Sequence, residues 1–531
     1  MSEKRDQSDG PGKDKIRNPG MNALEKSDRP VVPGKTENKA AERYGVAEPL
    51  EGRGRTKEKA EQNAMGSTQS GSAMGSGLDR LRQRAKEDKN TRFTALLHHV
   101  TVDLLRDSFL HLQRNSAPGV DGVTWKEYEQ GLEGRLIDLH GRVHRGSYRA
   151  QPSRRVYIPK PDGRKRPLGI ASLEDKIVQQ AVVVVLNAIY ENDFLGFSYG
   201  FRPGKKAHDA LDALSVALQF EETGWVLDAD IQGFYDNMSH EWTLAFLERR
   251  IADPRVLRLI QKWLRAGVSE DGEWSRTTIG TPQGAVISPL LANVYLHYVF
   301  DLWAQQWRQE SCAGAMFIIR YADDVVVAFQ YRGDAVRFHA ELVEQMRAHG
   351  LELHPEKTRL IEFGRFAEQK RKRSGDGPPD TFDFLGFTHI CSRSRGGKFF
   401  IKRRTVAKKM RATLARVKQE LYQRMHEPVK ETGKWLGAVV SGYYQYFCVP
   451  GNLPMMARFR HRVTRLWRRV LIRRGGQRKP SWERLTPLFE RWLPHARVLH
   501  PYPVERFSAK YPRWEPYAGK PPVRFCPGGA S

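Results

Sequence analysis

Residues 318–329, IIRYADDVVVAF, place two adjacent aspartates between two apolar runs. β-Branched runs on both sides of a short polar step favour a β-hairpin, whose tight connection would carry Ala322 and Asp323. Two neighbouring carboxylates repel each other unless a cation neutralises them. The pair therefore predicts either a solvated turn, where aspartate is common, or a site that binds cations.

The charge of the chain is unevenly distributed along its 531 residues. The net charge is +27, and residues 401–531 account for +22 of it, from 29 Lys and Arg against 7 Glu and no Asp. Solubility does not require such an excess of one sign, so we expect a polyanionic partner, with nucleic acid favoured over a membrane surface. No apolar run is long enough to cross a membrane and no signal peptide is evident, so a cytoplasmic location is expected.

Composition divides the chain into four segments. Residues 1–85 hold few apolar side chains and predict a disordered leader. Helical and strand patterns then alternate to residue 390, and residues 391–500 are predicted to be helical. The Pro-rich segment 501–531 predicts an irregular basic tail. One apolar stripe of a helix over 405–424 is formed by Val406, Met410, Leu414, Val417 and Leu421, with basic residues on its other faces.

A second acidic segment precedes the hairpin. In WVLDADIQGFYDN, residues 225–237, an apolar run ends at Asp230 and is followed by a Gly-containing turn. If this strand ends beside the hairpin, Asp230, Asp323 and Asp324 offer hard oxygen ligands for two Mg²⁺ ions. Two such ions activate an attacking 3′-oxygen and stabilise departing pyrophosphate. Taken alone, Asp230 is more typical of a turn or a helix cap than of a metal ligand.

Six segments, in this order and at this spacing, resemble the successive motifs of reverse transcriptases, and most closely those of group II intron-encoded reverse transcriptase/maturases. They are IPKPDGRKRPLGI (158–170), DIQGFYDN (230–237), TPQG (281–284), YADD (321–324), LHPEKTR (353–359) and FDFLGF (382–387). The resemblance implies an α+β right-hand polymerase, with fingers and an antiparallel palm sheet over 86–390. An α-helical thumb and maturase domain would follow over 391–500.

The resemblance also implies the catalytic residues. Asp230, Asp323 and Asp324 match the catalytic acids and metal ligands of the family, and the backbone carbonyl of Ile231 matches a further ligand. The expected cofactor is Mg²⁺, as two ions. The family resemblance and the chemistry of the acidic segments thus nominate the same side chains.

Five further residues match positions that bind the incoming nucleotide in the family. Lys160 and Arg166 would hold its triphosphate, a role that suits ammonium and guanidinium groups. Tyr235 would crowd a 2′-hydroxyl and so favour deoxynucleotides, although a core aromatic is the alternative. Gln283 would pack beside the nucleotide, and Lys357 would donate a proton or positive charge to pyrophosphate.

The C-terminal region is predicted to grip RNA. GYYQYF, residues 442–447, resembles the maturase region of the family, and its aromatics, with Trp467, would either stack on bases or pack helices. The candidate RNA-binding residues are Lys408, Lys409, Arg465, Arg468 and Arg469.

The expected function is RNA-directed DNA synthesis, combined with binding of a group II intron RNA and assistance to its splicing and mobility. The implied partners are the intron RNA, a primed RNA template, dNTPs and a DNA target. Cys526 stands alone in the tail, so the paired cysteines of a nuclease module are not expected. Two alternatives stay open: a splicing maturase with little polymerase role, and an enzyme recruited to host repair or defence.

Overall fold

A computed structural model of the chain describes residues 70–159, 165–474 and 480–510. All of these residues belong to one compact unit, Ala47–Ser531. Lys160 and most of the expected leader and tail lie outside the described residues. Among the described helices, none combines the length and the apolar character that crossing a membrane requires.

The N-terminal half is mainly helical, and its first helix lies inside the segment expected to be a disordered leader. The helix α3, Ser70–Glu87, packs on α7, Leu173–Asp193, through buried side chains that include Leu78, Leu81 and Ala85. The expected boundary at residue 85 is therefore wrong, because these three side chains recur at helical spacing and form one apolar face. The neighbouring helices are α4 Val102–His111, α5 Trp125–Glu129, α6 Leu132–Arg145, α10 His240–Glu248 and α11 Pro254–Arg265, with a 3₁₀ turn at Leu97–His99.

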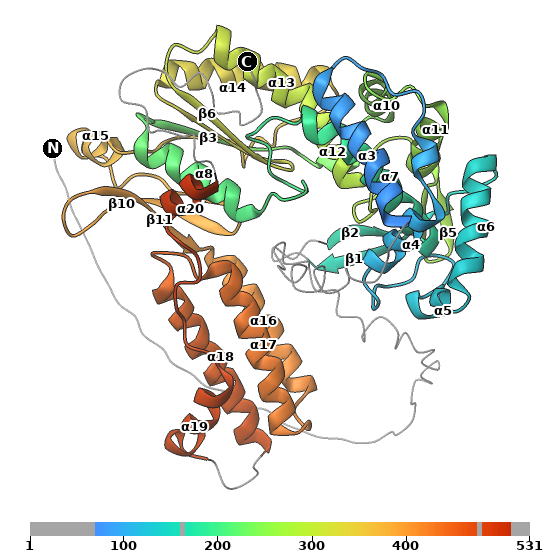
Figure 1. Cartoon of the computed structure of the whole chain (residues 1–531). Coiled ribbons are helices and arrows are strands. Elements are labelled where there is room, and N and C mark those ends of the chain that lie inside the picture. The colour runs from blue at the N-terminus through green and yellow to red at the C-terminus, as the bar shows by residue number, and fades with distance from the viewer. Residues whose placement is uncertain (1–69, 160–164, 475–479, 511–531) are drawn as a thin grey trace, which may run out of the picture. The chain divides into compact units, whose positions relative to one another are not determined.

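A four-stranded antiparallel sheet lies at the centre of the unit. Its order is β6–β7–β3–β8, with β3 Trp225–Asp230, β6 Met316–Tyr321, β7 Asp324–Phe329 and β8 Arg359–Glu362. The helix α8, Ala207–Phe220, covers one face and α14, Arg332–Ala348, covers the other (Figure 1). Alternate residues of β7 enter two different hydrophobic cores, which explains why this strand reads as a continuous apolar run.

Two smaller sheets flank this one. The first has the order β2–β1–β4–β5, with β1 Ser153–Pro159, β2 Lys165–Ile170, β4 Val268–Glu270 and β5 Glu273–Ser275. The second is antiparallel, with the order β11–β10–β9: β9 Phe382–Phe384, β10 Phe387–Arg393 and β11 Phe399–Thr405. Mixed helices and largely antiparallel sheets confirm the predicted α+β class.

One long helix contains a π-helical turn. The segments α12 Ser288–Leu296, the π turn η2 His297–Asp301 and α13 Leu302–Glu310 follow one another without a break. Two short helices lie elsewhere in the chain: α9, Phe234–Asn237, follows β3, and α15, Ala367–Arg373, follows β8.

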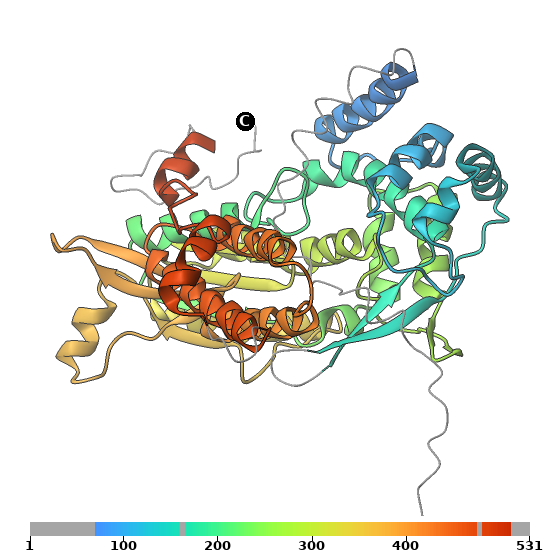
Figure 2. The same ribbon diagram turned by 90° about the horizontal axis from the view of Figure 1, so that it is seen from below.

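The C-terminal helices α16 Ala407–Gln423, α17 Val429–Phe447 and α18 Leu453–Arg474 run side by side, and α19 Trp482–Trp492 packs against them (Figures 1 and 2). The predicted apolar stripe of α16 is confirmed, because Met410, Leu414, Val417 and Leu421 are buried. Val406 immediately precedes the helix as its N-cap.

The expected irregular tail contains a helix, α20, Pro503–Lys510, which lies on α8 (Figure 1). The reason is a buried carboxylate: Asp212 of α8 is 1% exposed and accepts hydrogen bonds from Arg403 of β11 and from Arg506 of α20. The side chain of Phe507, also buried, adds an apolar contact to the same core. The ion pair between Arg506 and Asp212 thus joins the C-terminal helix α20 to α8, in the middle of the chain.

Candidate active site and nucleic-acid interface

The two adjacent aspartates lie at the tip of the predicted hairpin. Tyr321 of β6 pairs with Asp324 of β7, so Ala322 and Asp323 form the connection. Ala322 has a φ of +57°, which a non-glycine residue seldom adopts. The hairpin predicted from the β-branched runs is confirmed.

The third acid lies directly beside this tip. Strand β3 pairs with β7 in the register Asp230↔Asp324, so the last residue of one strand faces the first residue of the other. Antiparallel partners lie about 4.5–5.5 Å apart at their Cα atoms. Asp230, Asp323 and Asp324 therefore gather at one end of the sheet, as expected.

The pKa values of Asp323 and Asp324 are both raised by their surroundings. Burial raises the pKa of Asp323 above its ordinary value and the Asp230 carboxylate raises it further, whereas its own backbone N–H, Arg166 and Arg320 oppose the rise. Desolvation by the surrounding protein raises the pKa of Asp324, and repulsion from Asp323 and Asp230 raises it further. Because Asp324 is exposed to solvent, we ascribe its shift mainly to this repulsion.

Lys357 is brought to the acids as the sequence motif suggested. Its Nζ lies 2.5 Å from Oδ2 of Asp230. The segment that carries it is tied to the same strand end, because the His354 N–H donates to the Asp230 carbonyl at 2.8 Å. The lysine therefore provides a positive charge beside a carboxylate.

The donor set suits a divalent cation. Three carboxylates that repel one another supply the oxygen ligands that Mg²⁺ prefers. The side chain of Ile231 is buried and the residue bridges Leu353, so its backbone is what could contribute. As positioned here, the three acids supply the right kind of ligand but do not close around an ion, because among the described residues no three His, Cys, Asp or Glu side chains are grouped closely enough to hold one.

Three candidate nucleotide-binding residues lie on segments that touch one another. Arg166 of β2 is close enough to lower the pKa of Asp323. Later in the same strand, the Gly169 N–H donates to the Gln283 carbonyl at 2.8 Å. The other end of the TPQG loop bonds to Tyr235, whose carbonyl accepts from the Thr281 N–H at 2.8 Å. The TPQG loop therefore joins β2 to the turn after β3.

A buried arginine beside the acids was not predicted. Arg320, in β6, is fully buried and donates to both oxygens of Asp301, at 2.7 and 2.5 Å. The same side chain donates to Asn293 Oδ1 and to the carbonyl of Ala322, both at 3.0 Å. The available signal was a charged residue inside an apolar strand, which needs a buried partner.

The predicted RNA-binding cations occupy two places. Lys408, Arg465 and Arg469 are exposed on α16 and α18. Lys409 is also exposed, but its charge acts on Asp324 and lowers that residue's pKa, so it lies toward the acids. The Arg468 guanidinium lies 4.8 Å from the ring centre of Trp482, and its charge is thus already in a cation–π contact.

The aromatics proposed as base-stacking residues are mostly core residues. Tyr443, Tyr444, Phe447 and Trp467 are buried, and Tyr446 donates to the Leu385 carbonyl at 2.8 Å. Of the two alternatives that the sequence left open, helix packing is the one observed for these four. Their rings pack on other buried aromatics: Tyr443 stacks on Phe459, Phe447 contacts Phe387 and Trp467 contacts Phe489.

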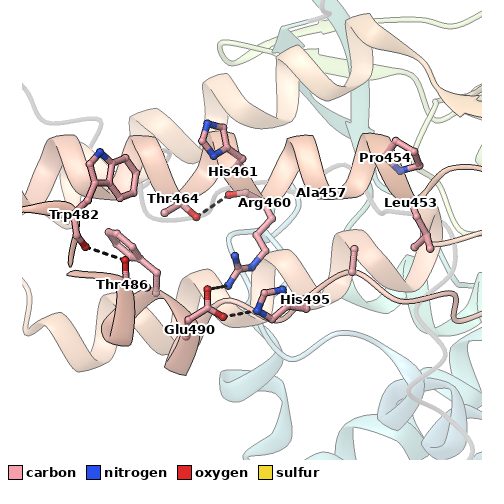
Figure 3. Close-up of a pocket in the computed structure, with 12 residues that line it drawn as sticks. Leu453, Pro454, Ala457, Arg460, His461, Thr464, Trp482, Thr486, Glu490 and His495 are labelled. Atoms are coloured by element: carbon pink, nitrogen blue, oxygen red, sulfur yellow. Dashed lines mark hydrogen bonds and ion pairs between the residues drawn. The ribbon is translucent and has the colours of Figure 1, made fainter. Parts of the chain in front are cut away.

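An exposed aromatic instead borders a pocket of about 510 Å³ between α18 and α19 (Figure 3). Trp482, 41% exposed, lies at one end of it. Along the lower wall in Figure 3, Glu490 accepts from Arg460 at 2.9 Å and is also bonded to His495. The pocket combines an aromatic wall with polar groups, in the size range of small-ligand sites.

Comparison with known proteins identifies the family. The family model described as reverse transcriptase (RNA-dependent DNA polymerase) matches residues 158–389. Protein YkfC of Escherichia coli K12 is 32% identical over 353 residues, which cover 59% of this chain and 87% of YkfC. The group II intron-encoded protein LtrA of Lactococcus lactis is 34% identical over 222 residues, which cover 41% of this chain and 37% of LtrA. An uncharacterized 91 kDa protein in the cob intron of Schizosaccharomyces pombe is 36% identical over 228 residues, which cover 41% of this chain and 28% of that protein. The chain therefore belongs to the reverse transcriptases, in the group that includes group II intron-encoded proteins.

Proposed function

We propose that this protein is an RNA-directed DNA polymerase that extends a primer 3′-hydroxyl with dNTPs, and that it also binds a group II intron RNA. The observation that carries the proposal is the strand register that gathers Asp230, Asp323 and Asp324 at one sheet end. In this assignment the segment from α3 to residue 390 forms fingers and palm, with the β6–β7–β3–β8 sheet as the palm. Residues 391–500 form the thumb and maturase region.

The three carboxylates and the Ile231 carbonyl would hold two Mg²⁺ ions. Bound there, the metal would acidify the primer 3′-hydroxyl and stabilise the charge on the leaving pyrophosphate. Lys357 would then exchange its contact with Asp230 for the pyrophosphate, to which an ammonium group donates a proton or positive charge. The short Lys357–Asp230 contact supports this role, because it keeps the lysine at the strand end.

The nucleotide would bind between β2 and the turn after β3. Arg166 and Lys160 would hold its triphosphate, Tyr235 would contact its sugar, and Gln283 would pack beside it. The hydrogen bonds that link the TPQG loop to Gly169 and to Tyr235 support this arrangement, because they hold three of the four residues on connected backbone. Preorganised contacts of this kind reduce the entropy lost on binding.

RNA would lie along the exposed basic residues of α16 and α18. Residues 401–531 hold most of the excess positive charge of the chain, which favours contact with a phosphate backbone. The pocket between α18 and α19 is large enough for an unpaired base, with Trp482 as the stacking surface. Binding of intron RNA in this region would assist its splicing, with the RNA supplying the chemistry of that reaction. In intron mobility the same protein would copy the RNA at a DNA target.

Primer extension tests the polymerase. The full chain would be given a primed RNA template, dNTPs and Mg²⁺, beside the Asp323→Ala variant. We expect cDNA from the natural protein and at least about a thousandfold less from the variant, because the variant lacks a metal ligand. Asp380→Asn, in an exposed pair with Arg371, is the matched control and should leave extension unchanged. Absence of cDNA from the natural protein would refute the activity, and equal cDNA from both would refute the site.

Splicing of the intron that flanks the coding sequence tests the second role. We expect splicing to survive Asp323→Ala and to weaken when Arg465, Arg468 and Arg469 are neutralised together. Loss of splicing in the aspartate variant would contradict this division of roles. A coding sequence with no foldable intron around it would favour recruitment of the polymerase to host repair or defence.

A further inference from the structure

We propose that Arg320, Asp301 and Asn293 are positioning residues, which hold the Ala322–Asp323 turn in the one conformation that sets Asp323 and Asp324 against Asp230. The inference rests on the proposed polymerase site. None of the three residues needs to touch a substrate, because Arg320 bonds to the backbone of the turn while Asp301 and Asn293 hold Arg320.

The first support is the set of partners that Arg320 has. Four hydrogen bonds leave its guanidinium: two to Asp301, one to Asn293 and one to the carbonyl of Ala322. Arg320 and Asp301 are both 0% exposed. A charged pair so deep in the protein gains little stability over apolar side chains of similar size, so its presence points to a geometric role.

The second support is that the network also fixes the opposite side of the turn. Asn293 accepts from Arg320 and donates to the carbonyl of Gly200 at 2.8 Å. A Cβ atom on Gly200 would lie 2.3 Å from the backbone nitrogen of Ala322. The backbone of the same segment also pairs with Arg320. The Arg320 N–H donates to the Phe197 carbonyl and the Tyr199 N–H donates to the Arg320 carbonyl, both at 2.9 Å. The turn is therefore enclosed by backbone whose position depends on the same arginine.

The third support is the π-helical turn, which has no other evident purpose in this helix. Asn293 and Asp301 are eight residues apart, and in a regular α-helix they would be rotated by about 80° from each other. A π turn accommodates one extra residue. Two residues that are eight apart across such a turn therefore point in nearly the same direction, like residues seven apart in a regular α-helix. The turn at His297–Asp301 therefore places both side chains on the face that meets Arg320.

The backbone conformation explains why such support is needed. Ala322 has a φ of +57°, where a side chain is disfavoured, and Asp323 follows it beside two other carboxylates. Left to itself, the turn would relax to a more common conformation and the acids would separate. The bond from Arg320 to the Ala322 carbonyl opposes that relaxation.

The test compares two buried Arg–Asp pairs in the full-length protein. Arg320→Met with Asp301→Leu removes the proposed network. Arg250→Met with Asp193→Leu removes a pair of similar burial, joined at 2.9 Å, in which Asp193 ends α7 and Arg250 follows α10. Three quantities are measured: primer extension with Mg²⁺, the affinity for Mn²⁺ alone by calorimetry, and amide hydrogen exchange over residues 318–326.

We expect the first double variant to extend primers about a hundredfold more slowly and to bind Mn²⁺ about tenfold more weakly, because its ligands are no longer held in orientation. Its turn amides should exchange faster at unchanged global stability. The control variant should stay within about threefold of the natural protein in both quantities. Equal losses in the two variants would overturn the proposal, as would natural rates in the first.

The single variants Asp301→Asn and Asn293→Ala keep the proposal falsifiable if either double variant fails to fold. Each removes part of the network, and each should show the same three changes to a smaller extent. If the natural protein extends no primer, the polymerase assignment fails by itself. Faster exchange at the turn in Asp301→Asn would still support the positioning, and unchanged exchange would refute it.

Discussion

Charge is concentrated in two regions of this chain, the acidic ends of β3 and β7 and the basic helices α16 and α18. The acids lie at and beside a turn held by a buried hydrogen bond, and repulsion from Asp230 raises the pKa of both Asp323 and Asp324. Lys408, Arg465 and Arg469 are exposed on regular helices. The activity of the acidic region is thus expected to depend on the exact positions of its carboxylates, whereas RNA binding by the basic region is expected to depend on its total charge.

This difference predicts how each region responds to substitution. A shift of one ångström in the acidic region is expected to cost about two orders of magnitude in rate. In the basic region, the removal of any one exposed cation is expected to cost a similar, additive increment of RNA affinity. Three substitutions test this contrast, and the first of them has the largest expected effect of the three.

Gly200→Ala should produce the largest effect, although Gly200 carries no charge. The added Cβ would meet the backbone nitrogen of Ala322 at 2.3 Å, so the turn must move. We expect primer extension to fall about a hundredfold and the free energy of unfolding to fall by about 1–3 kcal/mol. The control is Gly134→Ala in α6, where no atom lies within 4 Å of the added carbon. The control should keep full activity and gain about 0.5–1 kcal/mol, and an equal loss in both variants would remove the special status of the turn.

Arg465→Gln with Arg469→Gln should weaken RNA binding at least tenfold at low salt. These exposed side chains lie one turn apart on α18, where both can reach a phosphate backbone. The slope of log affinity against log salt should fall by roughly 1.4 to 1.8, because two phosphates would no longer be neutralised. Filter binding across a salt series measures it, with Arg82→Gln and Arg347→Gln as the control that removes two exposed charges elsewhere. An unchanged slope would mean that RNA lies on another face.

Trp482→Ala should have the smallest effect, a loss of RNA affinity of about fivefold to tenfold that corresponds to one stacked base. Because stacking releases no counterions, the salt slope should not change. Trp242→Ala is the matched control, since Trp242 is 39% exposed and Trp482 41%. If the two variants bind RNA equally well, the pocket between α18 and α19 does not hold a base.

Local patterns of the sequence predicted much of the fold. The β-branched runs around the two aspartates predicted the hairpin and its turn, and the stripe of α16 predicted which side chains are buried. The helix α3 was missed because residues 1–85 have a low apolar content as a whole, which conceals the short run from Leu78 to Ala85. The helix α20 was missed because a carboxylate nearly 300 residues earlier helps to hold it.

The candidate site divides in the same way. Asp230, Asp323, Asp324 and Lys357 follow motifs of a few residues each, and the structure brings all four together. Arg320, Asn293 and Gly200 were missed, because their contacts depend on tertiary packing that no short motif records. The burial of Tyr443 and Trp467 could not be told from exposure, since the same helical spacing suits a core and an RNA surface.

The buried carboxylate of Asp212 has a consequence for how the chain is made. Its two arginine partners follow it by 191 and 294 residues, so both arrive late in synthesis by the ribosome. Until then α8 carries an uncompensated acid toward the interior, which is unfavourable. Chains terminated before Arg506 would keep that acid half-paired, which makes residues near 500 a poor place to shorten this protein.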